Sequence, residues 1–204
     1  MRKSLFFTLF ITMCIYGFSQ TMEPEIVRMG KGKIIMLDGT TLEGEVQFSH
    51  TNQTRLTLWA NEEAQKIKTK EVKEFEIEGS RYVRISSGAL SIGSDEVFAK
   101  CLTPENFKIS IYEHISQGMV GSGGLFKTDR AYFVKFPSEE KARDFGDVAL
   151  IPFNKKVSKL VEDCPALSKK ILDKEKNYKL GVITTPEIQL DVYMRIANEY
   201  QQCN

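Results

Sequence analysis

Apolar residues recur at every second position between residues 32 and 87, and this periodicity constrains the fold more than any other feature. A period of two is typical of strands that bury one face. Turn signals interrupt the pattern at short intervals, namely Asp38-Gly39, the polar stretches 49–53 and 61–64, and Gly79-Ser80. We therefore expect about six short antiparallel strands, which must curl to bury their one apolar face. The segment 32–87 is predicted to form a small SH3-like barrel or a β-roll.

Further strand patterns lie in residues 88–153 and predict an antiparallel extension of this sheet. A glycine-rich stretch, MVGSGGLFKTDR (119–130), separates two of these strand patterns. A Walker-type phosphate loop needs the spacing G-x-x-x-x-G-K-[ST] and a helix after it. Here Lys127-Thr128 comes too late and a strand pattern follows, so we interpret the stretch as a hairpin loop without a phosphate site.

The hydrophobic period changes to three and four in residues 154–204, which predicts a helical C-terminal segment. Pro165 is expected to divide the first helical stripe into two pieces, with Asp163 as the cap of the second piece. Thr185 and Pro186 predict the start of the last helix. Its buried face would carry Ile188, Val192, Ile196 and Tyr200. Strands followed by helices define an α+β fold.

The N-terminus has the pattern of a signal peptide over residues 1–19. Arg2 and Lys3 precede the apolar run 5–15, and small residues stand at positions 17 and 19. The run is shorter than the roughly 20 residues that a bilayer-spanning helix needs. We therefore expect an exported protein, periplasmic or extracellular, with no transmembrane segment after cleavage and with residues 20–31 as an N-terminal linker.

The charge balance argues against a nucleic-acid partner. Loss of Arg2 and Lys3 with the signal peptide leaves 26 basic and 27 acidic residues, a net charge of −1. A near-neutral chain lacks the electrostatic footprint of a protein that binds nucleic acid. The expected partner is another envelope protein or a surface component.

Three cysteines remain after residue 19, which suggests one disulfide and one free thiol in an exported chain. Cys164 lies at the helix break and Cys203 at the end of the last helix, where crossing helices can bring their ends together. Cys101 lies in a strand pattern, where a buried thiol is common. We predict a Cys164–Cys203 disulfide. The alternative is a loose terminal thiol at Cys203 and a core-filling Cys164.

The order of these motifs resembles a group of uncharacterised exported proteins of Bacteroidetes-type bacteria. The resemblance is carried by the stretches GKIIMLDGTTLEGEV, IKTKEVKEFEIEGSRYVRI, ENFKISIYEH, RAYFVKF, VEDCPALSKKI and the C-terminal IANEYQQC. It covers nearly all of the chain after the signal peptide. It implies export and a layout of strands followed by helices, and it carries no activity.

Nothing in the sequence assigns a catalytic, cofactor-binding or metal-binding residue. The two histidines, His50 and His114, stand in no metal-binding motif. The residues favour a non-enzymatic envelope protein, a protein-binding or structural module. One alternative is a hydrolase that uses Cys101 or a serine with His114, which requires a histidine within about 3 Å of the nucleophile. The other alternative is a small-ligand-binding module, which requires a deep cavity with a few polar groups.

Overall fold

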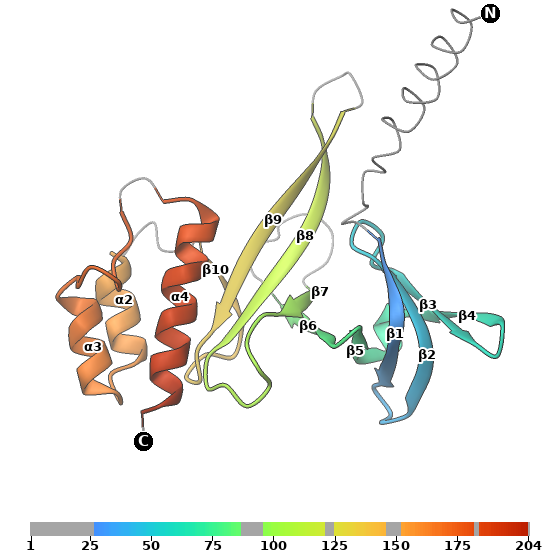
Figure 1. The fold of residues 1–204 in the computed structure, drawn as a ribbon, viewed down its shortest axis with the longest axis horizontal. Coiled ribbons are helices and arrows are strands. Elements are labelled where there is room, and N and C mark those ends of the chain that lie inside the picture. The colour runs from blue at the N-terminus through green and yellow to red at the C-terminus, as the bar shows by residue number, and fades with distance from the viewer. Residues whose placement is uncertain (1–26, 87–95, 121–124, 146–151, 182–183, 204) are drawn as a thin grey trace, which may run out of the picture.

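The computed structural model describes residues 27–86, 96–120, 125–145, 152–181 and 184–203, so the expected signal peptide lies outside the described residues. Their strands form one antiparallel sheet of ten strands in the order β10-β9-β8-β7-β6-β5-β1-β2-β3-β4 (Figure 1). The first strands are β1 (Val27–Met36), β2 (Thr41–Ser49), β3 (Arg55–Ala60), β4 (Glu63–Lys68), β5 (Val72–Ile77) and β6 (Ser80–Ser86), with a short 3-10 helix, η1 (Thr69–Glu71), before β5. The later elements are β7 (Glu96–Cys101), β8 (Ser110–Val120), β9 (Leu125–Lys135), β10 (Arg143–Asp144), α2 (Phe153–Leu160), α3 (Pro165–Leu172) and α4 (Pro186–Gln201).

The turns between the N-terminal strands follow the local chemistry that the sequence indicated. In the β1–β2 turn, Gly39 has a φ of 88° and the Thr40 amide donates to the Asp38 carboxylate at 2.8 Å. The β3–β4 turn has positive φ at both Asn61 and Glu62. Two central residues with positive φ give the mirror-image turns that match the twist of antiparallel strands. The prediction of about six short strands in this region is confirmed.

The closure of an SH3-like barrel is not seen among the described residues. β6 does not end the N-terminal sheet but pairs with β7, from Tyr82 opposite Lys100 to Ser86 opposite Glu96. The edge that would have to close the barrel is therefore occupied by the next part of the chain, and β4 and β10 are the two edges of an open sheet. The α+β class is confirmed, because helices follow this sheet.

Two facing glycines allow the N-terminal strands to approach closely. An isolated glycine in a strand pattern, such as Gly44, predicts a bulge. That prediction is wrong, because the β1–β2 pairing passes through Gly32 opposite Gly44 without a register shift. A Cβ at Gly32 would lie 1.8 Å from the carbonyl oxygen of Glu76 in β5, and one at Gly44 would lie 2.4 Å from that of Trp59 in β3. The glycines therefore make room for neighbouring backbone.

Replacing Gly32 by alanine is expected to lower the free energy of unfolding by about 2 to 3 kcal/mol, because the new methyl group collides with backbone that cannot rotate away. Gly39→Asn is the matched control, since a Cβ at Gly39 meets nothing within 4 Å and asparagine tolerates positive φ. Urea unfolding of both variants measures the difference. Equal losses in the two variants would show that close approach is not the function of Gly32.

Separate apolar cores lie at the two ends of the sheet. The N-terminal core is enclosed by β1–β7 and consists of Ile34, Val46, Phe48, Leu56, Leu58, Ile67, Val72, Phe75, Ile77, Tyr82 and Phe98. In the C-terminal core, one face of β8 and β9 packs against the helices, which Figure 1 shows at the opposite end of the molecule from β1–β4. Its helical members include Val157, Leu167, Ile171, Val192, Ile196 and Tyr200. A smaller cluster, Ile85, Ala99, Tyr112, Phe133 and Ala142, lies between them.

The helices begin where the prolines indicated. Pro165 is the first residue of α3, so it divides the stripe as predicted, and the Thr185 hydroxyl accepts from the Ile188 amide at the start of α4. Two of the predictions for these helices are wrong. Asp163 is not the cap of α3, because its carboxylate accepts from the Tyr200 hydroxyl at 2.6 Å. Ile188 is half exposed, because the buried residues of α4 begin one turn later, at Val192.

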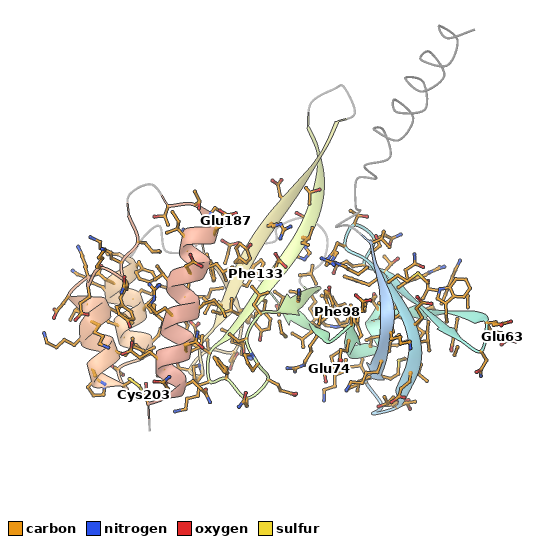
Figure 2. All side chains as sticks on the ribbon, in the orientation of Figure 1. Glu63, Glu74, Phe98, Phe133, Glu187 and Cys203 are labelled. Atoms are coloured by element: carbon orange, nitrogen blue, oxygen red, sulfur yellow. A yellow bond between two sulfur atoms is a disulfide. The ribbon has the colours of Figure 1, made fainter. Side chains whose placement is uncertain are left out.

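A disulfide joins Cys164, just before α3, to Cys203, just after α4, which confirms the predicted pairing. The two Cα atoms are 5.8 Å apart, inside the usual range for a disulfide. Figure 2 shows Cys203 at the end of α4. Cys101 is a free, half-buried thiol. Within the described ranges, none of the helices combines the length and the apolar character needed to cross a membrane.

Candidate functional site

A cleft of about 860 Å³ lies where the N-terminal strands meet β7 and β8. Its walls come from the β2–β3 loop, the end of β4 with η1, and the strands β6, β7 and β8. We call it the histidine cleft, because both histidines of the chain line it. The lining residues are His50, Thr51, Gln53, Thr54, Arg55, Lys68, Thr69, Lys70, Arg84, Glu96, Val97 and His114.

Each histidine reaches the cleft from the buried side of the sheet. The alternation that buries Val46 and Phe48 in β2 continues to His50, whose ring centroid lies 4.9 Å from that of Phe48. His114 lies within β8 rather than at a strand end. Each histidine is only 5% exposed. The polar residues around His50 suggested a surface turn, whereas the period of two that extends through it was the signal for burial.

Gln53 connects the walls of the cleft. Its side-chain oxygen accepts from the Phe98 amide at 2.8 Å, and its Nε2 lies 3.5 Å from Nδ1 of His114. The Gln53 carbonyl accepts from the Thr69 hydroxyl at 2.6 Å. One side chain and its backbone thus join the β2–β3 loop to η1, β7 and β8. This network holds the two histidines at one place although they are distant in the sequence.

The His50 ring has no hydrogen-bond partner at either nitrogen among the described residues. Burial, followed by the neighbouring charges of His114, Arg28 and Lys100, lowers the pKa of His50 to about 4. Burial also lowers the pKa of His114. Both rings are therefore neutral at neutral pH, and each offers one donor and one acceptor. A buried polar group left unpaired costs about 1 to 3 kcal/mol.

Positive charge dominates the lining. Arg84 is held by the protein itself, because it pairs with Glu96 at 2.9 Å and donates to the carbonyl of Val72. Arg55 and Lys68 stand directly opposite each other across the β3–β4 pair. Like charges in that position destabilise a sheet. Within the described part of the chain, neither of them forms an ion pair with an acidic side chain, and the same is true of Lys70.

The candidate hydrolase residues have no support in this geometry. Cys101 lies opposite Tyr112 in the β7–β8 pair and packs against the small central cluster. Burial raises the pKa of its thiol to about 11, whereas a reactive cysteine needs a lowered pKa. The hydrogen bonds of His114 among the described residues go to Gln53 and Phe98, and no serine takes part.

Three further clefts lie between described residues, beside β2 and β3, at α2, and between α2 and α4. The histidine cleft is lined by buried side-chain nitrogens, those of His50, that have no partner among the described residues. No described residue that lines the other three clefts has such an atom. In the described ranges, no three histidine, cysteine, aspartate or glutamate side chains converge in a way that could hold a metal ion. The histidine cleft is therefore the candidate site.

The chain matches no family model, no curated protein and no solved structure.

Proposed function

We propose that the protein is an exported, non-enzymatic binding protein of the cell envelope, periplasmic or extracellular, and that the histidine cleft holds its ligand. One observation carries this proposal: the buried His50 ring lines an open cleft, and neither of its nitrogens has a hydrogen-bond partner in the part of the chain that the structure describes. A purely structural core would be more stable with an apolar ring there. A bound ligand would satisfy these nitrogens and account for their presence.

Export is supported by the signal-peptide pattern of residues 1–19 and by the disulfide, which is typical of proteins in oxidising compartments. The resemblance to exported proteins of Bacteroidetes-type bacteria agrees with this location. The ligand group can be free in the envelope or part of a larger envelope molecule, since either would enter the same cleft. If another envelope protein carries the ligand group, the proposal also covers the binding of that protein.

The proposal predicts that cell-envelope extract changes the amide signals of the histidine cleft. Isotope-labelled protein, cleaved after Ser19 and oxidised, is titrated with extract of the source cells, divided into small solutes, polysaccharide and protein. We expect saturable shifts at Thr51, Gln53 and Thr69 with one fraction. Thr51→Trp should abolish these shifts, because Thr51 is an exposed residue at the cleft that a bulky ring would obstruct.

Thr184→Trp is the matched control, because Thr184 lines the separate cleft between α2 and α4. It should leave the shifts unchanged. If the shifts persist in Thr51→Trp, or arise only around α2 and α4, the ligand is bound elsewhere. If no fraction shifts any amide signal, the binding role itself is wrong.

A further inference from the structure

The ligand chemistry can be narrowed, on the basis of the binding role proposed above. We infer that the histidine cleft binds a tetrahedral oxyanion, a phosphoryl or sulfuryl group that is either free or carried on a lipid headgroup. Three features lead to this inference: the basic residues of the lining, the environment of His50, and the number of walls that supply donors.

The first feature is the arrangement of the cations. Arg55, Lys68 and Lys70 line the cleft and have no acidic partner among the described residues, and Glu96, the carboxylate in the described lining, pairs with Arg84. Arg55 and Lys68 face each other directly in the sheet, an arrangement that is unfavourable in the free protein. A bound anion between them would turn this repulsion into two attractive interactions. The lining is therefore complementary to negative charge.

The second feature is the environment of His50 inside the cleft. The charged and titratable groups that act on it are Arg28 from β1, Lys100 from β7 and His114 from β8, and they are cationic or become so on protonation. Tyr82 of β6 lies beside the ring, with 5.9 Å between centroids. An anion would bring negative charge to these groups and would accept the N–H of His50. Ligand binding and imidazole hydrogen bonding thus favour each other.

The third feature is that the donors come from separate walls. His50 belongs to the β2–β3 side, Arg55 and Lys68 to the β3–β4 pair, and Lys70 to η1. A planar carboxylate has two oxygens and pairs best with a single guanidinium in a bidentate geometry. A tetrahedral oxyanion presents three or more oxygens in different directions, so it suits donors that approach from several sides. Arginine and lysine together are common partners of such groups.

Titration with simple anions tests the inference. Inorganic sulfate, inorganic phosphate and acetate are added to the oxidised protein at constant ionic strength, with chloride as the balancing ion. We expect saturable shifts at the amides of Thr54, Thr69 and Lys70 with sulfate and phosphate, and about tenfold weaker binding of acetate. Glycerol phosphate and phosphatidylglycerol vesicles, with phosphatidylcholine vesicles as reference, then distinguish a soluble phosphate from a lipid headgroup.

Lys68→Gln is expected to weaken sulfate binding about tenfold, because one charge-assisted hydrogen bond is lost. Lys66→Gln is the matched control, since Lys66 lies on the same strand but outside the cleft lining. It should weaken binding less than about twofold at an ionic strength that screens charges beyond about 8 Å. Equal effects of the two variants would indicate unspecific attraction and would overturn the inference.

The inference and the binding role can fail separately. If sulfate and phosphate give no saturable shifts while an envelope fraction still binds at the cleft, the oxyanion inference is wrong and the binding role stands. If neither the anions nor any fraction binds, both are wrong. Saturable sulfate binding that Lys68→Gln weakens and Lys66→Gln does not would support both.

Discussion

Replacing both Cys164 and Cys203 by serine is expected to lower the free energy of unfolding by about 4 kcal/mol. The disulfide connects residues 39 positions apart. Closing a loop of this size lowers the entropy of the unfolded chain and thereby stabilises the folded protein by about 4 kcal/mol. It ties the start of α3 to the end of α4, so without it the C-terminal turn of α4 should fray first. Urea unfolding of the double variant, and of the wild type with reductant, measures the effect.

Cys101→Ser is the control for this prediction. Cys101 is a half-buried free thiol, so its replacement should change the free energy of unfolding by about 1 kcal/mol or less. The expected loss in the double variant is a large part of the 5 to 15 kcal/mol of a typical domain. If the reduced protein and the double variant unfold at the wild-type urea concentration, the disulfide does not stabilise the fold.

His50→Phe is expected to make the protein more stable in acid by about 3 kcal/mol relative to the wild type. In the unfolded chain the histidine pKa is near its ordinary value of 6.5, whereas burial lowers it to about 4 in the folded protein. The unfolded state therefore binds more protons, so the stabilising effect of neutral His50 is complete above about pH 6.5. This stabilisation is lost as the pH falls from about 6.5 to about 4, at about 1.4 kcal/mol per pH unit.

Urea unfolding of both proteins at about pH 7.5 and about pH 4 tests this prediction. The loss of stability common to both proteins comes from the carboxylates and from His114, which the variant retains. The difference between the two losses measures the contribution of His50 together with its charge interaction with His114. Near pH 7.5 the variant should be as stable as the wild type or more so, because phenylalanine can pack on Phe48 and leaves no unpaired nitrogen. A parallel pH dependence of the two proteins would contradict the assigned burial of His50.

The local parts of this fold could be predicted from the sequence, because their causes are local. Asp38-Gly39 specifies a hairpin turn by its own backbone preferences, and Pro165 starts a helix because it cannot continue one. The disulfide followed from the same reasoning, since Cys164 and Cys203 lie at helix ends that packing brings together. Each of these features is confirmed.

The open sheet and the histidine cleft depend on contacts between distant residues, and no local pattern specifies them. Whether β6 closes a barrel or continues to β7 depends on which strand competes better for its edge, and both outcomes have the same period of two. His50 and His114 are distant in the sequence but line one cleft, where Gln53 bridges the β2–β3 loop to β7 and β8. The like-charged pair of Arg55 and Lys68 becomes visible only when the register of β3 and β4 is known.

The two edges of the sheet have a consequence for self-association. In the described part of the chain, β10 pairs over two residues only, so it is a short template for another strand. β4, the other edge, is exposed at every residue except Ile67 and carries Glu63, Lys66 and Lys68. Charged side chains on an edge oppose its extension into fibrils by a second copy. Lys68 therefore lies at both the histidine cleft and this charged edge. If the cleft binds an anion as proposed, binding would also neutralise part of the charge that opposes self-association.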